Sequence, residues 1–252
     1  VLQVLEPIWW KRTETASRVR GRIESVLAFA IASGYRDGGN VANWKGNLDS
    51  ILPQPGKLKN VTHHKALPWS EVGAFMEKLR ERQGMAAKAL EFLILTAGRS
   101  GEVRGARWEE IDLKSKTWTV PAERMKTQKE HVVPLSDDAV TLLESLPRMN
   151  EFVFPGPRGG PLSDVSLSKP LKNMNATPHG FRSTFRDWCA ESTNYPNEVA
   201  EKALAHTVSN AVERAYRRGD LLAKRARLMR DWAKYCRTVQ VKGEVVAIRS
   251  AP

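Results

Sequence analysis

The sequence has little of what secreted and membrane proteins rely on. Its 252 residues include only two cysteines, Cys189 and Cys236, and both stand among apolar residues at helical spacing. They predict reduced packing residues rather than a disulfide or a metal site. No apolar run approaches the roughly 20 residues that cross a bilayer, so we expect no membrane partner. The first residues, VLQVLEPIWWKR, lack the basic start and cleavage site of a signal peptide, which favours a cytoplasmic chain.

Acidic residues are scarce relative to basic ones. Lysine and arginine total 40 against 28 aspartates and glutamates, giving a net charge of +12 and an isoelectric point of about 9.9. This excess favours a polyanionic partner, with nucleic acid ahead of a membrane surface. Apolar residues make up 41% of the chain, which is far from the composition of a disordered protein. The length suffices for one large domain or two modest ones.

Proline and glycine divide the chain near residues 53–68. The stretch PQPGKLKNVTHHKALP has no hydrophobic periodicity, which predicts a linker, placed at 56–68. A small helical domain is expected at 1–55 and a larger domain at 69–252.

Basic residues gather in the small domain and the linker. Apolar residues at helical spacing predict a helix over Thr15–Ser33, with Gly34 as its stop. Arginines near its start form either a solvated basic face or phosphate contacts, and the sequence leaves both open. The pair His63-His64 has no further ligands at metal-binding spacing, so no metal site is predicted there. The candidate DNA contacts in this region are Arg18, Arg20, Arg22, Lys57 and Lys59.

The larger domain is predicted to be mainly helical with a small antiparallel β-sheet. Two alternating segments, Lys116–Pro121 and Glu130–Leu135, predict a β-hairpin whose basic connection contains Lys126. Helices are expected from Ser70 to Leu79, over Ala86–Thr96, from Ser100, over Ser136–Leu146, over Lys169–Asn173, from Thr177, after Pro196 and over Asp220–Arg237. Serines at the first, third and fourth of these starts are expected to act as N-caps. The apolar face of the last helix packs either on its own domain or on a neighbouring protomer.

Arg99 stands at a tight bend beside a buried helix end. A charged group there needs a partner or a ligand anion, and Glu102 is the expected internal partner. Arg104 is expected to point to solvent or DNA. A second candidate is the segment Thr177-Pro178, which reads as a helix start with His179 in the first turn, where backbone N–H groups favour an anion. Arg182, three residues on, is expected on the same exposed helix face.

Two further residues complete the candidates. His206 follows a short helix, and Tyr216 lies within a third one beside Arg217-Arg218. Taken singly, these residues read more simply as a cap, a solvated face or a packing residue. Their order along the chain changes that interpretation.

The ordered residues Arg99, Lys126, His179, Arg182, His206 and Tyr216 resemble the catalytic constellation of the tyrosine recombinases. The surrounding segments resemble the corresponding segments of the integrases of prophages and genomic islands. They are AGRSGEVRGARWEEID, HGFRSTFRDW and LAHTVSNAVERAYRRGDL. Ala205 departs mildly from the glycine that many relatives have before the second histidine. The resemblance covers roughly residues 1–240.

The resemblance implies a partial helical core-binding domain at 1–55 and a mainly helical catalytic domain with a small sheet at 69–252. It implies a site-specific recombinase that binds double-stranded DNA at attachment sites and acts as a tetramer, without cofactors, at the bacterial nucleoid. We expect the chain to be N-terminally incomplete, without the arm-binding domain of such integrases. Tyr216 is implied as the nucleophile.

The chemistry follows from these residue types. Tyrosine has a pKa near ~10 and needs activation, while two arginines can hold the non-bridging oxygens of a phosphodiester. His206 would add a donor, and His179 would assist proton transfer with Tyr216. The resemblance implies that Lys126 protonates the leaving 5′ oxygen. The alternatives are a truncated integrase that only binds DNA, and a type IB topoisomerase, which shares the chemistry.

Overall fold

The computed structural model describes residues 1–58, 64–206 and 219–239. The chain divides into two units, Val1–His63 and His64–Pro252, and each has its own hydrophobic core.

The first unit is a small helical unit built around two tryptophans. Its elements are α1 (Leu2–Trp9), α2 (Thr13–Ala32), the 3-10 turn η1 (Leu48–Ser50) and α3 (Pro55–Leu58). Trp9 is fully buried, stacks on Trp44 at 5.6 Å between ring centroids and donates from Nε1 to the Pro53 carbonyl at 3.1 Å. Gly34 follows α2 with a φ of 72°, a left-handed value that glycine adopts without strain. The predicted helix and its stop are therefore confirmed, and the stretch predicted as a linker contains α3.

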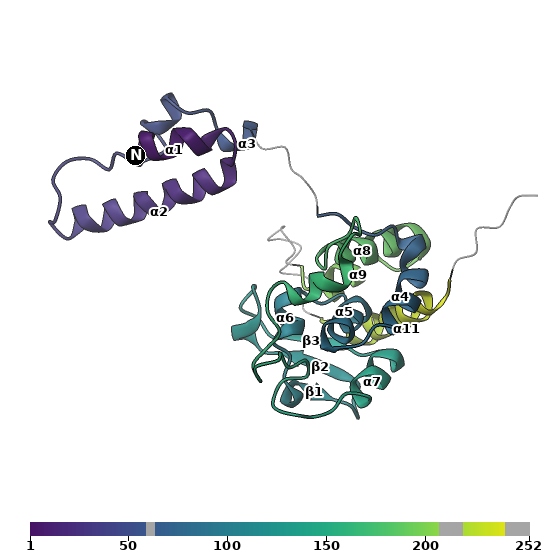
Figure 1. Cartoon of the computed structure of the whole chain (residues 1–252). Coiled ribbons are helices and arrows are strands. Elements are labelled where there is room, and N and C mark those ends of the chain that lie inside the picture. The colour runs from purple at the N-terminus through teal and green to yellow at the C-terminus, as the bar shows by residue number, and fades with distance from the viewer. Residues whose placement is uncertain (59–63, 207–218, 240–252) are drawn as a thin grey trace, which may run out of the picture. The chain divides into compact units, whose positions relative to one another are not determined.

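The second unit is mainly helical. Its helices are α4 (Val72–Arg80), α5 (Met85–Thr96), α6 (Ser100–Arg104), α7 (Asp137–Glu144), α8 (Gly180–Ser192), α9 (Asn197–Ala203) and α11 (Leu222–Arg237), with 3-10 turns η2 (Trp69–Glu71), η3 (Trp108–Glu110), η4 (Ala122–Arg124) and η5 (Ser166–Leu171). The helix α5 is nearly all apolar and is buried from Ala89 to Thr96, as its sequence predicts. The helices α4, α6, α7, α8 and α11 pack around it (Figure 1).

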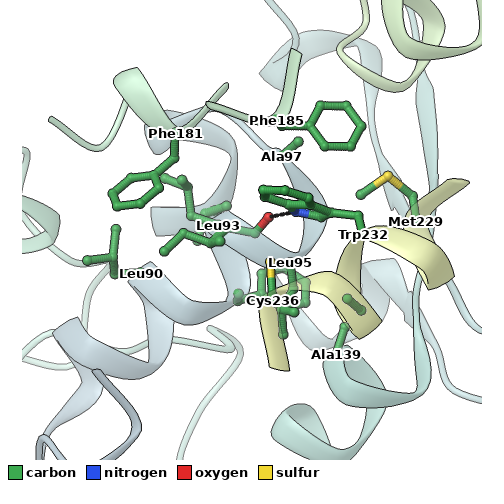
Figure 2. Close-up of a cluster of buried hydrophobic side chains, with 14 of the residues drawn as sticks. Leu90, Leu93, Leu95, Ala97, Ala139, Phe181, Phe185, Met229, Trp232 and Cys236 are labelled. Atoms are coloured by element: carbon green, nitrogen blue, oxygen red, sulfur yellow. Dashed lines mark hydrogen bonds between the residues drawn. The ribbon is translucent and has the colours of Figure 1, made fainter. Parts of the chain in front are cut away.

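The centre of this core is the contact between α5 and α11. Trp232 is fully buried and donates from Nε1 to the Ile94 carbonyl at 2.7 Å, as Figure 2 shows. Phe185 and Trp188 of α8 pack on Trp232 at centroid distances of 5.4 and 5.0 Å. The apolar face of α11 therefore packs on its own unit, which decides between the two interpretations of that face.

The sheet has three antiparallel strands in the order β1-β2-β3. They are β1 (Ile111–Asp112), β2 (Thr117–Val120) and β3 (His131–Pro134), with Trp118 opposite Val133 in the hairpin. The prediction of a mainly helical fold with a small antiparallel sheet and a β2–β3 hairpin is confirmed. The strand β1 was not predicted, because two residues are too few to show alternation.

The expected serine caps have mixed outcomes. Ser136 caps α7 and accepts from the Ala139 amide at 3.3 Å, as predicted. Ser70 makes no cap, because a 3-10 turn occupies Trp69–Glu71 and α4 starts after it. Ser100 is the first residue of α6, and Arg99 holds the cap position.

Two other helix predictions need correction. The helix α8 begins at Gly180, three residues after Thr177, although the Thr177 hydroxyl still accepts from the Gly180 amide at 3.0 Å. The helix expected at Lys169–Asn173 is the 3-10 turn η5. Both cysteines are buried and free, as predicted, and burial raises the pKa of the Cys189 thiol to about 12.

Within residues 1–58, 64–206 and 219–239, no helix combines the length and apolarity needed to cross a membrane. In the same residues, no group of three or more histidines, cysteines or carboxylates is arranged to hold a metal ion.

Candidate active site

Arg99 lies where α5 gives way to α6. The chain turns sharply because Ala97 adopts a left-handed φ of 50°. Glu102 then closes a capping box: its carboxylate accepts from the Arg99 amide at 3.0 Å and from Arg99 Nη1 at 2.7 Å. Glu102 is 5% exposed, so its carboxylate is held away from water. The predicted partnership of Arg99 and Glu102 is confirmed.

Arg182 is buried rather than displayed on an exposed helix face. It is 6% exposed and donates from Nη1 to the Ala97 carbonyl and from Nη2 to the Leu204 carbonyl at 2.6 Å. Burial, followed by the charge of Arg99, lowers the pKa of Arg182 to about 10. The expected exposure was wrong because the side chain reaches across to the α5–α6 turn and to the end of α9.

His206 joins these two arginines. It lies just beyond the end of α9. The preceding residue, Ala205, has a φ of 48°, which turns the chain back. His206 Nε2 lies 3.3 Å from Arg182 Nη2, and Arg99 Nη2 donates to the Ala205 carbonyl at 3.1 Å. The structure therefore brings together Arg99, Arg182 and His206 from three separate segments.

His179 occupies the N-cap position of α8. Its ring meets the ring of His64 edge-on, with 4.5 Å between centroids. Partial burial, followed by the positive fields of His64, Arg182, Arg99 and His206, lowers the pKa of His179 below its usual 6.5. A histidine with a lowered pKa is neutral at pH 7 and can accept a proton.

Lys126 lies exposed in the connection between β2 and β3. The buried side chain of Met125 fixes the preceding residue, and Arg124 ties the connection to Glu110 and to the Glu102 carbonyl. Within the part of the chain that the structure describes, Lys126 makes no hydrogen bond with Arg99, Arg182 or His206. Tyr216 and Lys59 lie outside the described residues.

The other candidate DNA-contact residues differ in whether their charges are already paired within the protein. Arg18 pairs with Glu14 at 2.9 Å on the surface, and Arg22 and Lys57 are exposed. Arg20 pairs with Glu24 at 2.7 Å and donates to the Ala42 carbonyl at 2.9 Å.

Arg104 does not point to solvent as expected. Its guanidinium donates to the Leu162 carbonyl at 2.8 Å and pairs with Asp164, and only 21% of the side chain is exposed. The loop after residue 152 folds over it. The helical pattern around Arg104 did not predict this cover.

Sequence reasoning missed two polar residues of the site. Glu201 of α9 contacts His206, and Arg186 of α8 contacts Glu201. Arg186 does follow Arg182 by four residues on the same helix, and this spacing was the one available signal.

Comparisons with known proteins agree with this geometry. The model of the phage integrase family matches residues 65–221, and the model of the phage integrase central domain matches residues 1–47. The chain belongs to the phage integrase family. The family predicted from the ordered residues is therefore confirmed.

Several integrases resemble this family member along most of its length. Prophage integrase IntZ of Escherichia coli (strain K12) is 36% identical over 243 residues, which cover 92% of this chain and 58% of the relative. The integrase of Enterobacteria phage P4 is 29% identical over 248 residues, covering 88% of this chain and 55% of the relative. This chain thus spans little more than half the length of these relatives.

Solved structures show the same fold. A lambda integrase tetramer bound to a Holliday junction superposes with a TM-score of 0.56 at 18% identity, covering 80% of this chain and 61% of that one. A lambda integrase dimer bound to a COC′ core site gives a TM-score of 0.55 at 18% identity, covering 77% of this chain and 72% of that one.

Proposed function

We propose that this chain is the DNA-cleaving and rejoining part of a site-specific recombinase that integrates and excises a prophage or genomic island. The observation that carries the proposal is the convergence of Arg99, Arg182 and His206 within hydrogen-bond distance of one another or of the same carbonyl groups. Two guanidinium groups and an imidazole so arranged suit a phosphodiester. Family membership and the net charge of +12 point to the same substrate.

The reaction assigns one role to each side chain. Tyr216 Oη attacks the phosphorus of the scissile phosphodiester, forming a P–O bond while the bond to the 5′ oxygen breaks. The neutral His179 takes the tyrosine proton, and Lys126 gives a proton to the leaving 5′ oxygen. Arg99, Arg182 and His206 stabilise the charge on the non-bridging oxygens. The result is a 3′-phosphotyrosyl link and a free 5′-hydroxyl.

The reverse reaction rejoins the strand. A 5′-hydroxyl from another strand attacks the phosphotyrosyl link, and Tyr216 leaves. One phosphodiester is exchanged for another, so the reaction needs no nucleotide hydrolysis.

The two units divide the work on DNA. Residues 1–55 act as part of the core-binding domain, 56–68 as the linker and 69–252 as the catalytic domain, with double-stranded attachment sites as substrate. Arg18, Arg22 and Lys57 are the exposed candidates for phosphate contacts in the described residues. Four copies assemble on the DNA in the cytoplasm, at the bacterial nucleoid.

A cleavage assay tests this proposal. Supercoiled plasmid carrying the attachment site is incubated with the chain in EDTA without ATP, stopped with detergent and scored for protein-linked DNA. The wild type is expected to form the adduct, Tyr216→Phe to form none while binding DNA, and Tyr35→Phe, which changes an exposed tyrosine of the first unit, to behave as wild type. An adduct with Tyr216→Phe would refute the nucleophile, and relaxation without joining of two sites would favour a topoisomerase.

A further inference from the structure

Glu201 is a carboxylate at the candidate site to which the proposed chemistry gives no role. It lies on α9, five residues before His206, and its side chain is 30% exposed. Its Oε2 lies 2.6 Å from His206 Nδ1, and its Oε1 accepts from Arg186 Nε at 2.9 Å. A chain of contacts therefore runs from Arg186 through Glu201 and His206 to Arg182.

The contact with Glu201 determines which nitrogen of His206 carries a proton. An ionised carboxylate only accepts hydrogen bonds, so the 2.6 Å contact assigns the proton to Nδ1. Arg182 only donates, and its Nη2 lies 3.3 Å from Nε2, so Nε2 presents its lone pair. His206 is thus assigned as the neutral Nδ1–H tautomer in this structure.

A bound phosphate requires the opposite protonation state of Nε2. A phosphate oxygen is an acceptor, so Nε2 must carry a proton to donate to it while Nδ1–H still donates to Glu201. His206 then holds two protons and a positive charge. Binding of the phosphodiester is therefore coupled to the uptake of one proton. The adjacent carboxylate stabilises the imidazolium against the positive charges of Arg99 and Arg182 and beside the titratable ring of His179.

We propose that Glu201 is a positioning residue that fixes the Nδ1–H tautomer of His206 and stabilises its imidazolium when Nε2 donates to the scissile phosphate. Arg186 holds the carboxylate in place from α8. This inference rests on the proposed function, in which His206 contacts the phosphate.

The two parts of this role can be separated by two substitutions. Glu201→Gln removes the negative charge and leaves one acceptor oxygen for Nδ1–H and Arg186 Nε to share, whereas Glu201→Ala removes the charge and both oxygens. Glu191→Gln, at an exposed carboxylate of α8 that accepts from Trp69, is the matched control.

The main measurement is the rate of adduct formation between pH 5.5 and 9. Because Glu201→Gln removes a charge-assisted hydrogen bond, we expect the rate of adduct formation at pH 8 to fall by about 10-fold to 100-fold. The loss is expected to shrink toward pH 6, because high proton concentration replaces the missing carboxylate in favouring the imidazolium. The alkaline limb of the rate profile thus moves to lower pH in Glu201→Gln and stays in place in Glu191→Gln. An unchanged rate and profile in Glu201→Gln would overturn the proposal.

A double substitution distinguishes this role from a general structural one. In a His206→Ala background, Glu201→Gln is expected to cause no further loss, because its effect passes through the imidazole. An equal loss in both backgrounds would overturn the assignment. Thermal melting of each variant shows whether the fold is retained.

A readout without DNA keeps this proposal distinct from the proposed function. The chain has five histidines, so ¹⁵N spectra of the full chain and of His206→Asn identify the signals of His206. We expect the Nδ1–H tautomer in the wild type, and a smaller share of it in Glu201→Ala, where only the donor Arg182 still favours a lone pair on Nε2. A wild-type Nε2–H tautomer would refute the inference, whereas failure of the wild type to form any adduct would refute the function and leave this spectrum to be read independently.

Discussion

Arg99 and Arg182 donate hydrogen bonds to the same acceptor, the carbonyl oxygen of Leu204. The Nη2–O distances are 3.3 and 2.6 Å, and the two side chains come from different parts of the chain. Two guanidinium groups this close repel each other, as the lowered pKa of Arg182 records after the larger effect of burial. An anion between them relieves that repulsion and is a stronger acceptor than a carbonyl.

Arg182→Lys is expected to slow adduct formation by about 10²-fold to 10³-fold, the usual loss on removing a preorganised donor from a developing oxyanion. Lysine carries its charge at one point and cannot span the Ala97 and Leu204 carbonyls. DNA affinity, measured by fluorescence anisotropy at fixed salt, is expected to change by only a few-fold. Arg158→Lys, at an exposed loop arginine, serves as the control. A wild-type rate in Arg182→Lys would show that the forked donor is not needed.

Local signals in the sequence predicted much of this fold. The apolar run of α5, the alternation of the β2–β3 hairpin and the amphipathic spacing of α11 depend on neighbouring residues, and each element is found where expected. The family resemblance singled out Arg99, Arg182 and His206, and the structure brings these three residues together. Neither source showed that Arg182 is buried, because that depends on how the ends of α5 and α9 meet it in space.

Long-range contacts account for the remaining errors. Arg104 looked exposed on its own helix, and only the loop that carries Leu162 and Asp164 reveals that it is covered. Glu201 was not among the candidates from the sequence, because its contact with His206 requires the turn at Ala205. Such contacts depend on how the chain turns between the two residues, and hydrophobic periodicity does not show those turns.

Gly180→Ala is expected to destabilise the second unit by about 1–3 kcal/mol. A Cβ at this position would lie 2.1 Å from the Lys65 carbonyl oxygen, which also accepts from the Thr177 amide at 2.9 Å. The backbone of residues 65–66 would have to move away from the start of α8. Urea unfolding measures the change. Gly101→Ala, where an added Cβ meets nothing within 4 Å, is expected to leave stability unchanged or raise it by up to about 1 kcal/mol. Equal effects at the two glycines would contradict the steric explanation.

Arg225→Met is expected to destabilise the fold by about 2 kcal/mol, because the carbonyl groups of Val132 and Asp220 lose their donor. Arg225 is fully buried, donates to the Val132 carbonyl at 2.6 Å and to the Asp220 carbonyl at 2.9 Å, and pairs with the Asp220 carboxylate. It therefore links β3 to the start of α11. Arg227→Met, on the exposed face of α11, is expected to stay within about 0.5 kcal/mol of the wild type in the same unfolding measurement. A loss as large for Arg227→Met would remove the case for a specific role of Arg225.

His131 is expected to make the stability of the second unit depend on pH. Burial, followed by the positive charge of Arg225, lowers its pKa to about 4, although Glu102, Asp220 and the Ala203 backbone act in the opposite direction. The unfolded chain, with a histidine pKa near 6.5, binds more protons than the folded one between these values. The contribution of neutral His131 to the free energy of unfolding is therefore fully present above pH 6.5. It falls by about 2–3 kcal/mol as the pH drops toward 4.

The measurement is the free energy of unfolding in urea at several pH values from 4 to 7.5. Because His131→Asn removes the titrating group, the slope below pH 6.5 is expected to flatten even if the variant is less stable at every pH. Part of the slope is expected to remain, since the pKa of His179 is lowered as well. A His131→Asn variant with the full wild-type slope would assign the pH dependence to other groups.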